Sequence, residues 1–237
     1  MRVIDRTTGK RINQADKEAS KALNSSDPIM RNAEKGLDLE EHSPMDPPDA
    51  YDGSVVDGIG YDQMHRLLQH YMDEHRTVTG KLDQFEKALA AFKENHYRMD
   101  AEINKVFGEF FNYFDHHILD HNQREEKQLF PLLHERLLAS EEHGEGLNPR
   151  TAVDMMEDDH VKFIQLGSLA FNMLGLAARL QDERSRMFVY DTAYNNGREL
   201  IEMLRLHIYR EDHILFPLAH QLITREEFEK LQPVQEK

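Results

Sequence analysis

From about residue 58 onward, apolar residues recur every three or four positions along the chain. This spacing follows the 3.6-residue turn of an α-helix, and the alternation of apolar and polar residues that is typical of strands is absent. A cluster of glycine, asparagine and proline between residues 144 and 149 marks a turn. The pattern therefore predicts an all-α fold, an antiparallel four-helix bundle with helices near residues 58–94, 98–138, 150–181 and 184–222.

The two ends of the chain have a different pattern. Residues 1–57 are polar and interrupted by serine and proline, so we predict an N-terminal extension of unknown role without a strong core, with a short helix around Ala15 to Leu23. Residues 58–237 then form the helical domain. Thr224 lies three residues before Glu227, which is the spacing of a capping box, and this predicts a short C-terminal helix.

Composition excludes several classes of function. Lysine and arginine total 29 against 44 aspartates and glutamates, and the formal net charge of −15 opposes binding to nucleic acid or to an anionic membrane. The absence of cysteine excludes disulfides, thiolate zinc sites and thiol chemistry. No apolar run reaches the roughly 20 residues that span a bilayer, and the first residues lack the apolar segment of a signal peptide. We therefore predict a cytoplasmic protein.

The 14 histidines are arranged in a repeat. The second predicted helix carries H-N-Q-R-E-E-K-Q-L-F-P-L-L-H from His121 to His134, and the fourth carries H-I-Y-R-E-D-H-I-L-F-P-L-A-H from His207 to His220. The two motifs are 207 − 121 = 86 residues apart, and His75 and His160 are 160 − 75 = 85 apart. A nearly constant offset indicates that a helix pair was duplicated, which predicts a bundle with a pseudo-two-fold axis.

Each helix is predicted to point a histidine into the core. Residues three, four and seven positions apart share one face of a helix. On the second helix the apolar stripe that includes Phe114 and Ile118 continues through His121 and Glu125. The other helices follow the same rule. The inward face of the third is predicted to include Met156, His160, Phe163, Ile164 and Phe171.

The buried polar residues favour a metal site. A single inward histidine is more often a hydrogen-bonded core residue, but six coinciding positions are hard to explain that way. Burying two carboxylates and four imidazoles would cost several kcal/mol per ionised group unless a cation compensates them. Nitrogen and oxygen donors suit iron, manganese or zinc better than calcium or magnesium, and two facing carboxylates can bridge two ions. The candidate ligands are His75, His121, Glu125, His160, His207 and Glu211.

Residues next to the candidate ligands are interpreted as structural. Pro131 and Pro217, in the two Leu-Phe-Pro runs, are predicted to kink or end each helix beyond the site. Five further neighbours are interpreted as packing or solvated charge, with a pocket wall or support of the ligands as the alternative. These five are Tyr71, Glu126, Met156, Asp159 and Asp212.

The motifs resemble those of the hemerythrin-like, HHE cation-binding family, whose signature is a histidine on one helix followed by H-x-x-x-E-E-x-x-L-F-P on the next. The match covers about residues 58–231. The doubled set looks most like the repair-of-iron-centres proteins, which are di-iron proteins linked to nitric oxide and oxidative stress. The resemblance implies two iron ions with an oxo or hydroxo bridge, manganese or zinc being possible substitutes. Glu125 and Glu211 would bridge the ions, and the four histidines would be terminal ligands.

Two departures refine this resemblance. Oxygen-carrying hemerythrins have an extra histidine one turn before the third-helix ligand, where this chain has Met156, so an oxygen carrier of that type is disfavoured. Repair proteins tend to have a cysteine-bearing N-terminal domain, and this chain has no cysteine.

Ferritin-like di-iron enzymes use Glu-x-x-His on two helices, a spacing that only Glu157 and His160 match here.

The expected function is to bind or process nitric oxide, oxygen or peroxide under oxidative or nitrosative stress, with repair of iron centres as one form of it. Two alternatives remain open at this point. The protein could be a non-catalytic sensor or store of oxygen, nitric oxide or iron, with a protein partner bound through the N-terminal extension. It could also be a peroxide-consuming, catalase-like enzyme. The residues do not distinguish turnover from binding, and they do not indicate an oligomeric state.

Overall fold

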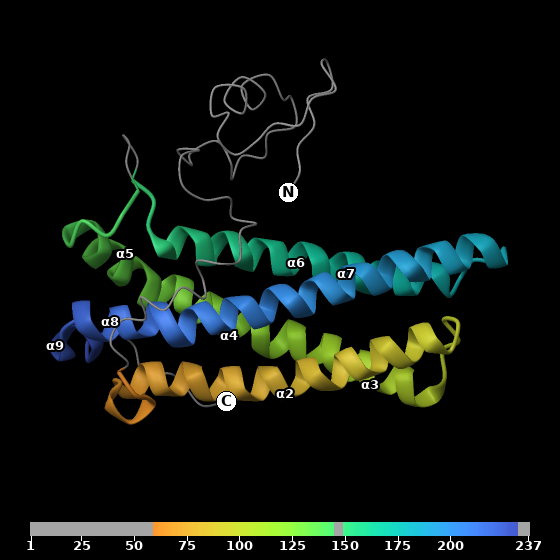
Figure 1. Ribbon diagram of the computed structural model, residues 1–237, viewed down its shortest axis with the longest axis horizontal. Helices are drawn as coiled ribbons and strands as arrows, with labels where there is room; N and C mark the ends of the chain where they lie inside the picture. The colour runs from red at the N-terminus through yellow and green to blue at the C-terminus, as the bar shows by residue number, and fades with distance from the viewer. Residues whose placement is uncertain (1–58, 145–148, 232–237) are drawn as a thin grey trace, which may run out of the picture. The chain divides into compact units, whose positions relative to one another are not determined.

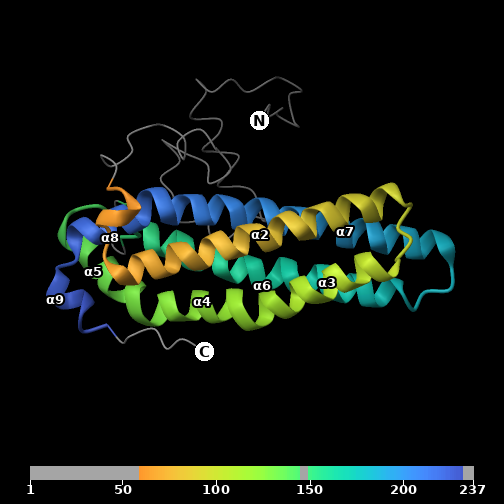
Figure 2. The same ribbon diagram turned by 90° about the horizontal axis from the view of Figure 1, so that it is seen from below.

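A computed structural model describes residues 59–144 and 149–231 of the chain, and all regular structure within these ranges is helical. Four long helical rods run alongside one another, as Figures 1 and 2 show in two views, and consecutive rods are antiparallel. The predicted all-α bundle is thus confirmed. The predicted N-terminal extension and its helix around Ala15 to Leu23 lie outside the described residues.

The rods agree closely with the predicted ranges. The first is α2 (Arg66–Glu94) and the third is α6 (Ala152–Ala177). The second consists of α3 (Ala101–Tyr113), η4 (Phe114–Ile118), α4 (Leu119–Arg124), η5 (Glu125–Leu129) and α5 (Phe130–Ala139). The fourth consists of α7 (Glu183–Arg210), η6 (Glu211–Leu215) and α8 (Phe216–Leu222). A short 3₁₀ turn, η3 (Tyr61–Gln63), precedes the first rod, and α9 (Arg225–Phe228) follows the fourth.

Local capping explains where the helices begin. The first rod starts at Arg66 rather than near residue 58, because His65 has an extended backbone and its ring accepts a hydrogen bond from the Leu67 amide. Asp100 caps α3, and Thr151 forms a capping box with Asp154 at the start of α6. The predicted capping box at Thr224 is present and starts α9.

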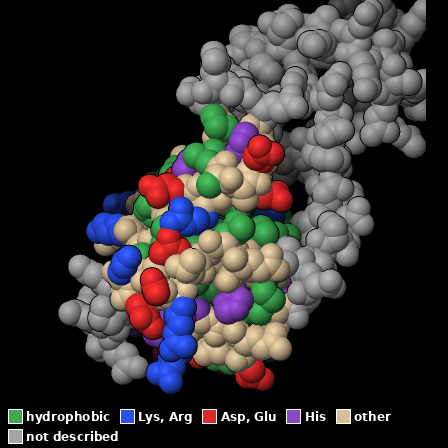
Figure 3. Space-filling model, turned by 90° about the vertical axis from the view of Figure 1, so that its left-hand side faces the viewer, with side chains coloured by type: hydrophobic (Ala, Val, Ile, Leu, Met, Phe, Trp, Pro, Cys, Tyr) green, Lys and Arg blue, Asp and Glu red, His purple; other side chains and the backbone are tan. Residues whose placement is uncertain are grey.

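One end of the bundle is closed by the short C-terminal helix. The buried ring of Phe228 in α9 stacks on His65, with ring centroids 4.4 Å apart. This contact fastens the C-terminal helix to the start of α2. Figure 3 looks onto this end, where acidic and basic side chains alternate with apolar and histidine side chains, so the negative net charge is not concentrated on the visible part of this face.

Three segments of the rods, η4, η5 and η6, are π-helical. In η5 and η6 the amides of Phe130 and Phe216 donate to the carbonyls of Glu125 and Glu211, five residues earlier. The wider turn directly precedes Pro131 and Pro217, which lack an amide and would crowd an ordinary α-turn. Pro131 and Pro217 were predicted to kink or end their helices. They do not end them, because the rods continue to Ala139 and Leu222, close to the predicted ends at residues 138 and 222.

The apolar core consists of two clusters on either side of the buried histidines. The larger cluster includes Phe85, Phe110, Phe163 and Leu204. The smaller one lies toward α5, α8 and α9 and includes Phe130. A buried polar layer thus separates two apolar regions. No helix in the described part of the chain is both long and apolar enough to cross a membrane.

The orientation of α6 differs from the prediction. Ile164 and Phe171 were expected to face inward, but they are 48 % and 57 % exposed. The buried line instead runs through Phe163, Gly167 and Ala170. A Cβ on Gly167 would lie 2.9 Å from the ring of Phe114, so this glycine lets the two rods approach closely. Small residues therefore mark the inward face here, and apolar periodicity does not reveal them.

Replacing Gly167 with alanine should destabilise the protein. Crowding of the buried Phe114 ring costs about 1–3 kcal/mol, which exceeds the gain of about 1 kcal/mol from better helix propensity. Chemical denaturation should show the loss of up to about 2 kcal/mol. The matched control is Gly80→Ala, at an exposed position of α2 where nothing lies within 4 Å of the added Cβ, and that variant should be slightly stabilised. A stabilised Gly167→Ala variant would contradict the close approach.

Candidate metal centre

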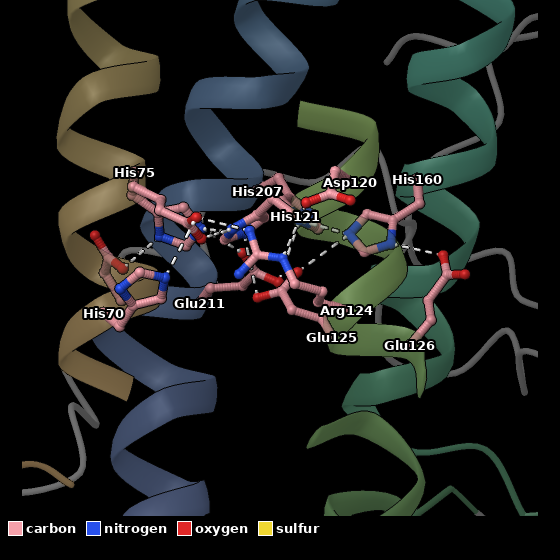
Figure 4. A network of polar contacts seen from close by, with 12 residues as sticks. His70, His75, Asp120, His121, Arg124, Glu125, Glu126, His160, His207 and Glu211 are labelled. Atoms are coloured by element: carbon pink, nitrogen blue, oxygen red, sulfur yellow. Dashed lines mark hydrogen bonds and ion pairs between the residues drawn. The ribbon is translucent and has the colours of Figure 1, made fainter. Parts of the chain in front are cut away.

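All six candidate ligands meet in the polar layer between the two apolar clusters. Figure 4 shows them pointing toward one another from the four rods. Each histidine is at most 5 % exposed, and both glutamates are fully buried. His75 comes from α2, His121 from α4, His160 from α6 and His207 from α7, while Glu125 and Glu211 are the first residues of η5 and η6.

The first group of donor atoms surrounds His75 and His121. Their Nε2 atoms are 3.0 Å apart. An oxygen of Glu211 lies 3.2 Å from the Nε2 of His75, and an oxygen of Glu125 lies 3.4 Å from the Nε2 of His121. These four residues can offer donor atoms that all lie within 4.8 Å of one another.

The second group repeats this arrangement with His160 and His207, whose Nε2 atoms are 3.1 Å apart. The other oxygen of Glu211 lies 3.2 Å from the Nε2 of His207, and the other oxygen of Glu125 lies 3.8 Å from the Nε2 of His160. Each glutamate therefore presents one oxygen to each histidine pair. The two groups share both carboxylates and differ in their histidines.

Four carboxylates from neighbouring rods fix the imidazole rings from behind. The Nδ1 of His75 contacts Asp212 at 2.7 Å, and that of His160 contacts Glu126 at 2.8 Å. A carboxylate that faces Nδ1 favours the proton on that nitrogen, which leaves the Nε2 lone pair pointing inward, as a metal ligand requires. The remaining two contacts join the Nδ1 of His121 to Glu74 at 2.7 Å and the Nδ1 of His207 to Asp159 at 3.4 Å.

Part of this layer of supporting carboxylates was not predicted from the sequence. The interpretation of Glu126, Asp159 and Asp212 as solvated charges is wrong, because each contacts a candidate ligand. Glu74 was not identified at all. Two arginines complete the layer: Arg124 donates to Glu74 at 2.6 Å, and Arg210 donates to Asp159 at 3.4 Å. The duplication could have revealed these residues, because each has a counterpart in the other half of the chain. Glu74 and Asp159 are 85 residues apart, and Arg124 and Arg210 are 86 apart, as are Glu126 and Asp212.

The site fits a bound cation. All four oxygens of Glu125 and Glu211 are buried and have no hydrogen-bond partner among the described residues. An ionised carboxylate buried without donors costs several kcal/mol, which a cation would offset. The separations of 3.0 and 3.1 Å within the histidine pairs match the value of about 3.0 Å for two nitrogens at right angles, each about 2.1 Å from one ion. The buried cluster therefore fits a metal-binding site.

Electrostatics favour positive charge at His75 and His207. Burial lowers the pKa of His75, but Asp212 and Glu211 outweigh it and raise this pKa to about 10. Burial likewise lowers the pKa of His207, and Glu211 and Asp159 raise it to about 9. Burial raises the pKa of the Glu211 carboxyl, yet His207 and His75 hold it well below its ordinary value. The carboxylates thus stabilise positive charge in the site, whether a proton or a metal ion carries it.

A π-turn begins at each of the two buried glutamates. His121 and Glu125 are separated by four residues, and so are His207 and Glu211, and in both pairs the glutamate is the first residue of the π-helical segment. Such wide turns occur often at functional sites because they change the direction of one side chain within a helix. The duplication of this feature indicates that it belongs to the geometry of the site. Nothing in the sequence pattern predicted it.

Removing the charge of a supporting acid should weaken metal binding. Glu74→Gln keeps a hydrogen-bond acceptor for His121 but removes the negative charge that polarises the imidazole. Loss of such outer contacts typically lowers metal affinity about 10- to 100-fold. Competition with a chromophoric chelator would measure the affinity. The control is Asp73→Asn, one residue away and exposed, where no change is expected. Equal affinities of Glu74→Gln and wild-type protein would exclude this role.

Comparison with known proteins agrees with the geometry. A family model described as the hemerythrin HHE cation binding domain matches residues 66–219, which is more than half of the chain and includes all six candidate ligands. No curated protein and no solved structure matches the chain. Given this match and the buried cluster of histidines and glutamates, the chain belongs to the hemerythrin HHE cation-binding family.

Proposed function

We propose that this protein holds two iron ions between its four rods and uses them to bind or process a small molecule, either nitric oxide, oxygen or peroxide. One observation carries the proposal: each buried glutamate presents one oxygen to each of two histidine pairs. His75 and His121 would hold one ion, His160 and His207 would hold the other, and Glu125 and Glu211 would bridge them.

The donor set suits iron, and it suits manganese and zinc as well. Imidazole nitrogens and carboxylate oxygens suit iron, manganese and zinc, whereas calcium and magnesium prefer sites built from oxygen alone. Resemblance to the di-iron members of the family selects iron among the three. Each ion would receive two nitrogens and two oxygens from the protein, which leaves positions open for a small ligand. An iron pair with open positions supplies redox chemistry and affinity for diatomic molecules.

The protein's own residues would keep the metal ligands in a fixed orientation and exclude water from the metal centre. The Phe216 ring stacks on His75 with centroids 5.6 Å apart, and the Phe130 ring stacks on His160 at 5.7 Å. Both phenylalanines are fully buried. These rings fix the orientation of the two imidazoles and exclude water, which strengthens the electrostatic interactions inside the site. The carboxylates behind the imidazoles raise the basicity of the ligating nitrogens.

A role in oxidative or nitrosative stress, including repair of iron centres, is the finer form of the proposal. It rests on the doubled set of four histidines and two glutamates, which resembles the repair proteins. The chain contains no cysteine. Transfer of iron through a thiol of this chain is therefore not part of the proposal, and released iron would have to leave through nitrogen and oxygen ligands.

Metal analysis followed by rapid kinetics tests the proposal. Protein purified without oxygen and supplied with Fe²⁺ should retain two iron ions per chain, and Mössbauer spectra should show a coupled pair after oxidation. One ion or none would contradict it. Stopped-flow mixing of the reduced protein then distinguishes the roles. Rapid peroxide loss supports a peroxide-consuming enzyme, a long-lived spectral change with oxygen or nitric oxide supports binding or sensing, and iron transfer to an apo-acceptor supports repair.

A further inference from the structure

One departure from the pseudo-two-fold symmetry lies at a pair of residues beside the centre. Tyr71 lies four residues before His75, and Met156 lies four residues before His160, so the two positions correspond with the same offset of 85. Both side chains are buried, at 0 % and 2 % exposure. The first half of the site therefore has a phenol where the second has a thioether. A phenol can donate a hydrogen bond, whereas a thioether can only accept a weak one.

The hydroxyl group of Tyr71 is buried without a hydrogen-bond partner among the described residues. The Tyr71 ring meets the edge of His121 at 5.2 Å and stacks on Phe216 at 6.1 Å, which places the phenol in the wall of the site. Buried hydroxyls nearly always find a partner, because an unpaired one loses its hydrogen bonds to water. An unpaired donor beside a candidate metal site points to a partner that binds there.

The surroundings of this half leave room for a small molecule. A cavity of about 210 Å³ reaches His121 from the outside of the bundle, between Glu74 and Val78 of α2 and His117 of η4. This volume admits a molecule of a few atoms. The guanidinium of Arg124 lies 5.7 Å from the centre of the Tyr71 ring, and its charge is paired with Glu74 and Asp120. The cavity is lined by His121, whose ring contacts Tyr71, and Tyr71 itself is not part of the lining.

We propose that the external ligand binds on the side of His75 and His121, and that the Tyr71 hydroxyl donates a hydrogen bond to it. The ligand class is a small anion or diatomic molecule with an exposed acceptor atom. Met156 offers no such donor, so the two metal positions differ in ligand affinity although their protein ligands are alike. This inference rests on the proposed function, because the ligand would be held on the centre that Glu125 and Glu211 bridge.

Azide binding to the oxidised, iron-containing protein tests the inference. Azide is a small anion that accepts hydrogen bonds, and its binding can be followed by absorbance. Tyr71→Phe should weaken azide binding roughly 3- to 10-fold, the equivalent of one lost hydrogen bond, and should leave two iron ions per chain. Met156→Leu at the corresponding position and Tyr190→Phe in the larger apolar cluster are the matched controls. Both should bind azide as the wild-type protein does.

A second measurement separates ligand binding from a structural role. Because the hydroxyl has no hydrogen-bond partner in residues 59–144 and 149–231, the metal-free Tyr71→Phe protein should have the same melting temperature as metal-free wild-type protein, or a higher one. A clear decrease, or a variant that fails to fold, would show that the hydroxyl supports the fold and would overturn the inference. Unchanged azide affinity would overturn it too, as would a phenolate-to-iron absorption band lost in Tyr71→Phe, which would make Tyr71 a direct ligand.

The same samples distinguish failure of the two proposals. Two coupled iron ions in both wild-type and Tyr71→Phe proteins, with equal azide affinities, would overturn the role of Tyr71 and leave the di-iron centre intact. Fewer than two metal ions in wild-type protein would overturn the di-iron centre and, with it, the role of Tyr71.

Discussion

Glu125→Ala combined with Glu211→Ala is expected to abolish metal binding and to lower the melting temperature of the protein by roughly 10 to 20 °C. These glutamates provide all the carboxylate oxygens within the two donor groups. Metal at 100 times its dissociation constant stabilises a protein by about 2.7 kcal/mol per site. Two sites give about 5 kcal/mol, and for a chain of this size each kcal/mol shifts the melting temperature by about 2–4 °C. Elemental analysis and calorimetry on the same samples measure both effects.

The comparison needs an unaffected variant and a metal-free reference. His143→Ala changes an exposed histidine whose ring, among the residues that the structure describes, contacts the adjacent backbone carbonyl of Gly144, so it should alter neither metal content nor melting temperature. Chelator-treated wild-type protein should melt close to the untreated double variant. Unchanged iron stoichiometry in both single variants, Glu125→Ala and Glu211→Ala, would remove the glutamates from the set of ligands.

Phe85→Ala should produce a loss of stability of similar size while leaving the metal in place. Phe85 is fully buried and stacks on Phe110 with ring centroids 3.9 Å apart, and two further phenylalanines of the second rod meet its edge. Truncation of such a ring costs about 3–5 kcal/mol. The larger apolar cluster lies beside the polar layer and contributes no donor atom to it. Chemical denaturation should therefore show a clear loss of stability in this variant, whereas metal analysis should show an unchanged metal content.

The exposed Phe188 provides the matched control. Its side chain is 74 % exposed, so Phe188→Ala should change stability by no more than about 0.5 kcal/mol. The metal content of Phe85→Ala is measured at temperatures where the variant is still folded. A loss of metal in proportion to the loss of stability would show that the centre and the larger cluster form one cooperative unit. Retained metal would show that the polar layer keeps its geometry when the adjacent core is weakened.

The sequence alone determined the features that depend on spacing along a helix. Apolar periodicity located the four rods to within a few residues, apart from the start of the first, where the cap at His65 outweighs the pattern. The repeat of H-x-x-x-E, with two further histidines at a matching offset, identified six residues that the structure brings together. Their role as iron ligands stays a prediction. These inferences succeed because residues three or four positions apart share a helix face in any fold.

Only the tertiary structure decided which residues meet across the rods. The contact of Asp212 with His75 joins residues 137 positions apart, and neither a motif nor helix periodicity encodes it. The outward rotation of Ile164 follows from the close approach of Gly167 to Phe114. The lack of a hydrogen-bond partner for the Tyr71 hydroxyl within the described part of the chain follows from how apolar groups pack around it. Such contacts depend on the rotation and separation of whole helices. Those quantities are fixed when the side chains of all four rods pack together, which no single stretch of sequence specifies.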